Sequence, residues 1–270
     1  MVQLLQRSNF NISNSIISYS EEDNLMWYNL YTSQVKNLRG KVHEPFFQLL
    51  EELCLPIDRV PQLHEVSSIL RNKTGWVVTR VNELINYNDF FYLLANKVFP
   101  STTYIRRLGD FSKDPDIFHE LFGHCPMLLD KNYSVFLNKL AKLALKCPRL
   151  EQIVLQRFLW YTIEVGLIQT SQGLRIYGGA LISSPQESVY SLESDKPERK
   201  TFDLLDISRS PYRADILQTN YYFIEDLNEL YNLEFSIENL SSITKLAKQL
   251  GEYPAKFRIE DNKYTNANIF

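Results

Sequence analysis

A run of apolar residues in the middle of the chain constrains the fold most. Residues 150–168 are predicted to form one long helix, and its second half, from Phe158 to Ile168, is apolar on almost every side. A helix of that kind has to be buried, so other elements must surround it. Glu164 lies within this stretch and needs a positively charged partner, because an unpaired buried carboxylate is costly.

Two kinds of cation could neutralise Glu164. One is an arginine, for which Arg157 and Arg106 are the candidates. The other is a metal ion, because two of the four histidines, His119 and His124, lie close together in another largely apolar stretch. Two imidazoles with one carboxylate and no thiolate are typical of iron(II) sites that leave positions open for oxygen and substrate, or of catalytic zinc. The metal is the more economical interpretation, and the arginine pair stays open.

The spacing of the two histidines predicts a helix end between them. On a regular α-helix, residues five apart point about 140° away from each other. We predict that a helix begins at residues 114–116 and ends at Gly123, where a left-handed turn would swing His124 toward the face that carries His119.

The same spacing disfavours a zinc protease. Its H-E-x-x-H motif would begin at His119 and Glu120, but the position that needs the second histidine is Gly123. Cys125 is predicted to be a small apolar residue rather than a thiolate ligand.

The rest of the pattern predicts a mainly α protein with short β-strands and an active site in a cleft lined by helices. Helices are expected at residues 20–40, 44–53, from Pro61 to about Gly75, 88–96, 134–146, 221–230 and 237–250; strands are expected at 76–81 and 174–179, with loop and short strands over 203–218. We expect a single catalytic domain over residues 1–270, with an irregular segment at 1–19 and a polar tail at 254–270.

Composition narrows the partners and the compartment. With 29 basic and 32 acidic residues and no basic run interleaved with aromatics, the chain is not expected to bind nucleic acid. Three irregularly spaced cysteines indicate free thiols in a reducing compartment. No secretion leader is visible, and no apolar run reaches the roughly 18 residues of a membrane span, so a cytoplasmic protein is expected. His43 and His64 are predicted to be solvated helix residues.

Four motifs in order resemble those of the pterin-dependent aromatic amino acid hydroxylases, and most closely the bacterial phenylalanine 4-hydroxylases. They are Tyr104-Ile105-Arg106 and the segments 114–124, 160–167 and 177–184, and the resemblance spans about residues 20–230. It implies the catalytic-domain fold of that family, without the regulatory domain and the tetramerisation helix of the animal enzymes.

The resemblance also implies a reaction. It is that of a phenylalanine 4-monooxygenase, which converts L-phenylalanine to L-tyrosine with O2, a tetrahydropterin and non-haem Fe(II) held by His119, His124 and Glu164. The cofactors would supply the difficult chemistry, and the protein a dry aromatic pocket. A monomer or weak homo-oligomer is expected. Alternatives are a tryptophan or tyrosine hydroxylase of the same fold, a zinc hydrolase with Glu120 as base, and a binding protein without metal.

The resemblance assigns substrate residues. Arg106 would hold the substrate carboxylate in a bidentate pair, Asp116 would orient that guanidinium, Ser183 would lie near the substrate and a histidine ligand, and Trp160 would line the ring pocket. The residues alone also allow an Arg106 on the surface, an Asp116 that only caps a helix and a Trp160 that only fills the core.

For the pterin, Phe90 matches the aromatic residue that stacks on the ring, Leu84 and Ile85 its neighbouring loop, and Glu120 a polar contact beside the iron. Phe90 also fits an ordinary helix core position. The chain departs from the family pattern in three places, which puts pocket shape and pterin preference in doubt: Leu159 replaces an aromatic residue, Ala180 replaces a glycine, and the loop 107–113 is two residues shorter than in the animal enzymes.

Overall fold

The computed structural model describes residues 16–81, 85–107, 115–233 and 235–257. The chain is mainly helical with short strands, as predicted. Its α-helices are α2 (Glu21–Leu38), α3 (Pro45–Leu53), α4 (Leu63–Lys73), α5 (Tyr87–Ala95), α6 (Lys131–Ala144), α7 (Arg149–Leu159), α8 (Gly179–Ser183), α9 (Pro185–Glu193), α10 (Leu204–Arg209), α11 (Leu227–Tyr231) and α12 (Ile237–Leu250). Three further helical turns are η1 (His119–His124), η2 (Met127–Leu129) and η3 (Trp160–Glu164).

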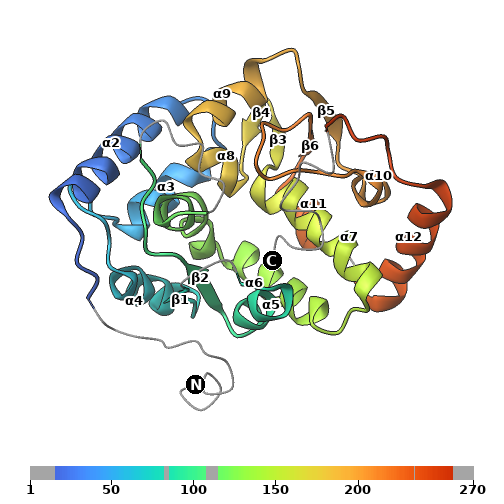
Figure 1. Ribbon diagram of the computed structural model, residues 1–270, viewed down its shortest axis with the longest axis horizontal. Helices are drawn as coiled ribbons and strands as arrows, with labels where there is room; N and C mark the ends of the chain where they lie inside the picture. The colour runs from blue at the N-terminus through green and yellow to red at the C-terminus, as the bar shows by residue number, and fades with distance from the viewer. Residues whose placement is uncertain (1–15, 82–84, 108–114, 234, 258–270) are drawn as a thin grey trace.

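The strands form two small sheets. In the first, β1 (Val77–Arg80) and β2 (Val98–Ser101) are parallel and are connected through α5. The second contains β3 (Leu167–Thr170), β4 (Gly173–Ile176), β5 (Glu198–Thr201) and β6 (Asn220–Ile224) in the order β4-β3-β6-β5. Its β3–β4 hairpin is antiparallel and its other pairs are parallel. Figure 1 shows α2, α3 and α4 toward one end of the molecule and α10 and α12 at the other.

Polar residues at the helix starts explain most of the helix boundaries. Ser20 and Asp23 form the capping box of α2 where the sequence predicts a cap. Two predicted starts are wrong by a few residues. Helix α5 is capped by Asn86 instead of Asn88, and α4 starts after Gln62, which makes a capping box with Glu65, so Pro61 lies outside the helix.

The predicted long helix over residues 150–168 is wrong in its last part. Helix α7 ends at Leu159, η3 continues to Glu164, and β3 begins at Leu167. Gly166 permits the chain to turn there, because a Cβ atom at this position would lie only 2.2 Å from the carbonyl oxygen of Thr162. Strand β3 pairs with β6 as well as with β4, and residues 221–224 of β6 lie in the segment 221–230 that is predicted to be helical. Buried strands and buried helices share a continuous apolar pattern, which explains both errors.

Two shorter segments also differ from their predictions. Residues 204–209 form helix α10, although loop and short strands are predicted at 203–218, and β4 ends at Ile176, so Gly179 starts α8 instead of ending a strand. His64 is exposed on α4 as predicted, whereas His43 precedes α3 and is half-buried.

The helix α7 and the turn η3 lie in the main hydrophobic core, which confirms the predicted burial of this segment. Phe158 is fully buried there, and its ring makes edge-to-face contacts with the rings of Phe136 and Phe235. Cys125 and Cys147 are buried, Cys54 is exposed, and all three are free thiols. Among the described residues, no helix is both long enough and apolar enough to cross a membrane.

Candidate active site

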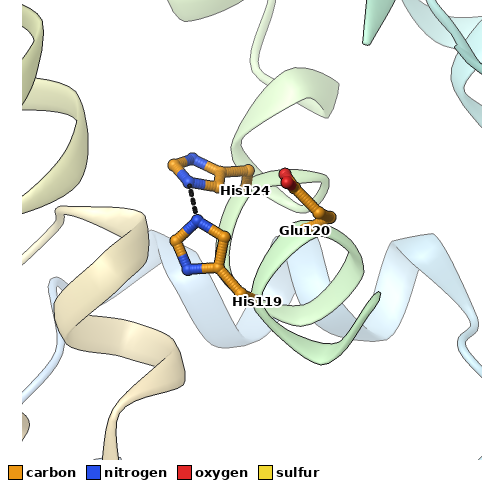
Figure 2. Close-up of side chains that lie close together, drawn as sticks. All are labelled: His119, Glu120 and His124. Carbon is orange, nitrogen blue, oxygen red and sulfur yellow. Dashed lines mark hydrogen bonds between the residues drawn. The ribbon is translucent and has the colours of Figure 1, made fainter. Parts of the chain in front are cut away.

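The two histidines lie on η1, which is a π-helical turn. The backbone N–H of Cys125 donates to the carbonyl of Glu120, five residues earlier, at 3.2 Å. A π-helix takes more residues per turn than an α-helix, so side chains five apart return to the same face. The Nε2 atoms of His119 and His124 are 3.1 Å apart, and Figure 2 shows the two rings side by side.

The predicted helix end at Gly123 is therefore wrong. Gly123 is not among the residues with positive φ, so the left-handed turn does not form, and η1 continues to His124. The glycine has another role. A Cβ atom at this position would lie 2.6 Å from the carbonyl oxygen of Gly179, so the absence of a side chain lets α8 approach η1.

Glu164 meets both histidines from a second π-helical turn. In η3 the N–H of Val165 donates to the carbonyl of Trp160 at 2.9 Å, again five residues back. Oε2 of Glu164 lies 3.1 Å from Nε2 of His124 and 3.7 Å from Nε2 of His119. The two arginines considered as partners form ion pairs with other carboxylates, Arg106 with Asp116 and Arg157 with Glu252.

The spacing of these three atoms fits a metal ion. A first-row ion bound at about 2.1 Å to each ligand keeps neighbouring ligands roughly 3.0–3.4 Å apart. The observed separations of 3.1, 3.1 and 3.7 Å are close to that range. The structure therefore brings together the three predicted ligands with little rearrangement needed to coordinate an ion.

Helix α8 orients both imidazoles. Oγ of Ser183 lies 2.9 Å from Nδ1 of His119 and donates to the carbonyl of Ala180 at 3.3 Å. This network assigns the His119 proton to Nδ1, which leaves the lone pair of Nε2 for a metal. Burial and the neighbouring His124 lower the pKa of His119 to about 3, so its ring is neutral at pH 7. The ring of His124 lies against Gly179, where a Cβ atom would be 2.4–2.7 Å from three of its atoms.

Two carboxylates lie beside the histidines, and their pKa values shift in opposite directions. A carboxylate oxygen of Glu120 lies within 4.8 Å of a ring nitrogen of His119 and of a ring nitrogen of His124 (Figure 2). Burial, followed by the charges of Glu164 and Asp116, raises the pKa of Glu120 well above its usual value. Burial also acts to raise the pKa of Glu164, but the two histidines outweigh it and the pKa is lowered. The opposite directions of the two pKa shifts thus favour Glu164 over Glu120 as the anionic ligand candidate.

The raised pKa of Glu120 disfavours its use as the base of a hydrolase, since a general base must be ionised. Cys125 follows the histidines in sequence and is fully buried. Burial raises the pKa of its thiol well above the usual value, so it is a thiol rather than a thiolate, consistent with the predicted apolar role.

Asp116 connects Arg106 to η1. Its side chain is fully buried and accepts from the guanidinium of Arg106, from the backbone N–H of Arg106 at 2.9 Å and from the N–H of His119 at 3.0 Å. Both predicted roles of Asp116, helix cap and partner of Arg106, are thus fulfilled by one carboxylate. Arg106 also donates to the carbonyl of Ser183 at 3.3 Å, and its buried Nε has no hydrogen-bond partner among the described residues.

Trp160 begins η3 and is held by residues that the sequence did not indicate. Its ring stacks on Tyr212, with centroids 4.7 Å apart and planes 10° apart. Its indole N–H donates to Oε1 of Gln218 at 3.0 Å. Both partners follow α10 in a segment predicted only as loop and short strands, and no motif marks them.

The predicted pterin residues are less closely gathered. Phe90 is half-buried on α5, with its ring edge-on to Phe91 at 5.3 Å, and Ile85 packs against the small apolar cluster that includes Val77 and Leu93. Leu84 lies outside the described residues.

Of the three departures from the family pattern, Leu159 and Ala180 do not supply any of the proposed ligand atoms. Leu159 is buried at the end of α7, and Ala180 is half-buried on α8. Most of the shortened loop, residues 108–113, lies outside the described part of the chain.

Known proteins share this sequence and this fold. The family model of the biopterin-dependent aromatic amino acid hydroxylases matches residues 6–263. Phenylalanine-4-hydroxylase of Pseudomonas aeruginosa is 42% identical over 246 residues, which cover 90% of this chain and 93% of that protein. The apo structure of the cold-active phenylalanine hydroxylase of Colwellia psychrerythraea 34H has a TM-score of 0.87 at 38% identity and covers 94% of this chain and 99% of that one.

A structure of Chromobacterium violaceum phenylalanine hydroxylase with iron and phenylalanine bound has a TM-score of 0.82 at 35% identity, covering 91% of this chain and 90% of that one. The matches extend over nearly the whole chain and include the segments that carry the two π-helical turns. The chain therefore belongs to the biopterin-dependent aromatic amino acid hydroxylase family.

Proposed function

We propose that this protein is a phenylalanine 4-monooxygenase that converts L-phenylalanine to L-tyrosine with O2, a tetrahydropterin and iron(II). The observation that carries the proposal is the convergence of His119, His124 and Glu164 beside the buried Arg106–Asp116 pair. Two imidazoles and one carboxylate suit iron(II), and the guanidinium suits the carboxylate of an amino acid. The names of the relatives from Pseudomonas and Colwellia support phenylalanine as the substrate.

Iron and tetrahydropterin, when bound, supply the activation of O2. We propose that the chain's residues position the substrate for it. Arg106 would bind the carboxylate through its free Nε and the guanidinium face not used by Asp116. Ser183 keeps His119 in the tautomer that presents Nε2, and Trp160 forms one wall for the aromatic ring. This arrangement would hold the ring near the metal and away from water.

The pterin contacts remain proposals from the family pattern. We propose that Phe90 stacks on the pterin ring, that Leu84 and Ile85 flank it, and that the neutral carboxyl of Glu120 donates a hydrogen bond to it. The raised pKa of Glu120 supports the last assignment, because only a protonated acid can donate. We also propose a single catalytic domain that acts in the cytoplasm as a monomer or weak homo-oligomer, without a nucleic-acid partner.

The two carboxylates beside the histidines provide the sharpest test. Oxygen uptake and tyrosine formation are measured with phenylalanine, ferrous iron and a tetrahydropterin for the wild type, Glu164→Gln and Glu120→Gln. We expect Glu164→Gln to lose both stoichiometric iron and activity. Glu120→Gln should keep its iron, because a neutral amide replaces a neutral acid. Iron retention and tyrosine formation by Glu164→Gln would falsify the ligand assignment.

Product analysis with phenylalanine, tyrosine and tryptophan separates the family's substrate classes. A wild-type protein that hydroxylates only tyrosine or tryptophan would retain the iron site and change the substrate. A zinc hydrolase or a binding protein would show no pterin-dependent oxygen uptake after loading with iron under anaerobic conditions.

A further inference from the structure

The amide of Gln218 sits at the centre of a hydrogen-bond network beside Trp160. Its Oε1 accepts from the indole N–H, and its Nε2 donates to the carbonyls of Arg213 at 2.7 Å and Ile216 at 2.8 Å. Gln218 is only 3% exposed. Each side-chain atom that can form a hydrogen bond is thus used, which leaves the amide with one orientation.

The backbone of Gln218 is fixed as well. Its N–H donates to Oε1 of Glu187 at 3.1 Å, and the same oxygen accepts from the hydroxyl of Tyr221 at 2.7 Å. Glu187 lies on α9, which directly follows the helix that carries Ser183. The network therefore connects α9, which follows the helix that orients His119, to Trp160.

We infer that Gln218 is a positioning residue that fixes the indole of Trp160 and thereby sets the width of the pocket for the substrate ring. The stack on Tyr212 restrains the tilt of the indole plane, but a stacked ring can still slide and rotate within that plane. The hydrogen bond to Gln218 removes this freedom, because an N–H donor is directional. Gln218 acts through Trp160, and within the described part of the chain it forms no hydrogen bond with His119, His124 or Glu164. The substrate in this inference rests on the proposed function, whereas the fixing of the Trp160 indole by Gln218 does not.

The test is a double-mutant cycle between Gln218→Met and Trp160→Phe in the full-length, iron-loaded protein. Methionine keeps the length of glutamine and removes the acceptor, and phenylalanine removes the donor. We expect Gln218→Met to raise the KM and the calorimetric dissociation constant for phenylalanine about tenfold, the equivalent of one lost hydrogen bond. The value of kcat should change less than about twofold, because the metal side is untouched. In the Trp160→Phe background the same substitution should have little further effect on substrate binding.

Two further variants and one fluorescence measurement allow the result to be interpreted. Gln169→Met is the matched control, because Gln169 is exposed on β3, which pairs with the strand that follows Gln218, and should leave binding unchanged. If Gln218→Met does not fold, Gln218→Asn serves instead, since it keeps the amide but is too short to reach the indole and both carbonyls together. The emission of Trp160 in the metal-free protein, obtained as the difference from Trp160→Phe, should lose anisotropy in either Gln218 variant.

An equal rise in KM in both backgrounds, or none in either, would overturn the role of Gln218. Unchanged anisotropy of the Trp160 emission would also overturn it, because the indole would then be fixed by Tyr212 alone. A wild type that makes no tyrosine would instead contradict the proposed function, and the emission measurement would still decide the role of Gln218.

Discussion

The two π-helical turns that form the site are held in place in different ways. In η1, both histidines lie within six residues, and the neighbouring helix α8 orients them through Ser183 and Gly179. In η3, Glu164 is the one proposed ligand, and Trp160 depends on Tyr212 and Gln218, about fifty to sixty residues further along. The proposed metal side is thus built mainly from the close packing of η1 against a helix, whereas the indole of Trp160 is held by one ring stack and one hydrogen bond from a segment outside the helices and strands.

Gly179→Ala should have the largest effect on the first turn. The new Cβ would overlap the ring of His124, which must then turn away from the other ligands. We expect the affinity for ferrous or cobaltous ion to fall at least about a thousandfold, or ~4 kcal/mol, measured by anaerobic titration calorimetry. Ala180→Gly is the control, because it adds no atom to the same helix. Wild-type affinity in Gly179→Ala would mean that α8 does not hold η1 rigidly.

Arg106→Lys separates the proposed substrate anchor from the proposed metal ligands of η1, to which Asp116 connects it. Lysine cannot donate to Asp116 and to a substrate carboxylate in the planar arrangement of a guanidinium. We expect the KM for phenylalanine to rise about a hundredfold, or 2–3 kcal/mol, with iron content unchanged. Arg107→Lys should have little effect in the same kinetic assay, since Arg107 is exposed and pairs with Asp23. Loss of iron in Arg106→Lys would show that substrate anchoring by Arg106 and metal binding by the two histidines cannot be separated.

Glu187→Gln tests the network behind the second turn through pH. Burial raises the pKa of Glu187 from 4.5 to about 7, although bonds from Tyr221 and Gln218 act to lower it. The folded state therefore binds the proton more tightly than the unfolded state, and stability falls as pH rises from about 4.5 to about 7. The variant lacks this loss, so its stability relative to wild type should improve by roughly 2 kcal/mol between pH 5 and pH 8.

Urea unfolding at the two pH values measures this difference. Glu193→Gln is the control on the same helix, because that side chain is 58% exposed and pairs with Lys41 at the surface. A stability difference between Glu187→Gln and wild type that is the same at both pH values would show that Glu187 is ionised in the folded protein throughout.

Ser183→Ala should have the smallest effect, again on the first turn. It removes the acceptor of the Nδ1 proton and leaves the ring of His119 in place. We expect the affinity for ferrous ion to fall about tenfold, in the same calorimetric titration as for Gly179→Ala. Ser184→Ala removes the N-cap of α9 and should lower stability without weakening metal binding. Equal metal affinities of the two serine variants would contradict the orienting role of Ser183.

The contrast between the two turns also explains what could be predicted from sequence. His119 and His124 are local and chemically distinctive, and Glu164 is conspicuous as a carboxylate in an apolar segment, so all three were identified as candidates before the fold. The π-helical geometry was missed because a spacing of five residues fits either a helix end or a wider turn. Gln218 and Tyr212 were missed because their roles depend on tertiary contacts that no local pattern encodes.

The errors in secondary structure have a similar cause. Leu167 and Ile168 of β3 are buried and pair with Phe223 and Ile224 of β6, so the apolar residues at this pairing do not alternate with polar ones. Helix α7 does occupy the core as its composition requires, and only the point at which it ends was wrong. Burial could thus be predicted from composition, whereas the switch from helix to strand at Gly166 depends on close contact with Thr162 and Tyr177.

Asp116 has a consequence for which amino acids fit. One carboxylate holds the guanidinium of Arg106 and the backbone of His119, so the proposed substrate anchor and the first proposed metal ligand belong to one rigid frame. The distance from the carboxylate of an amino acid bound at Arg106 to the metal site is then fixed. The reach of its side chain, as much as the shape of the pocket, decides which ring atom lies at the reactive end.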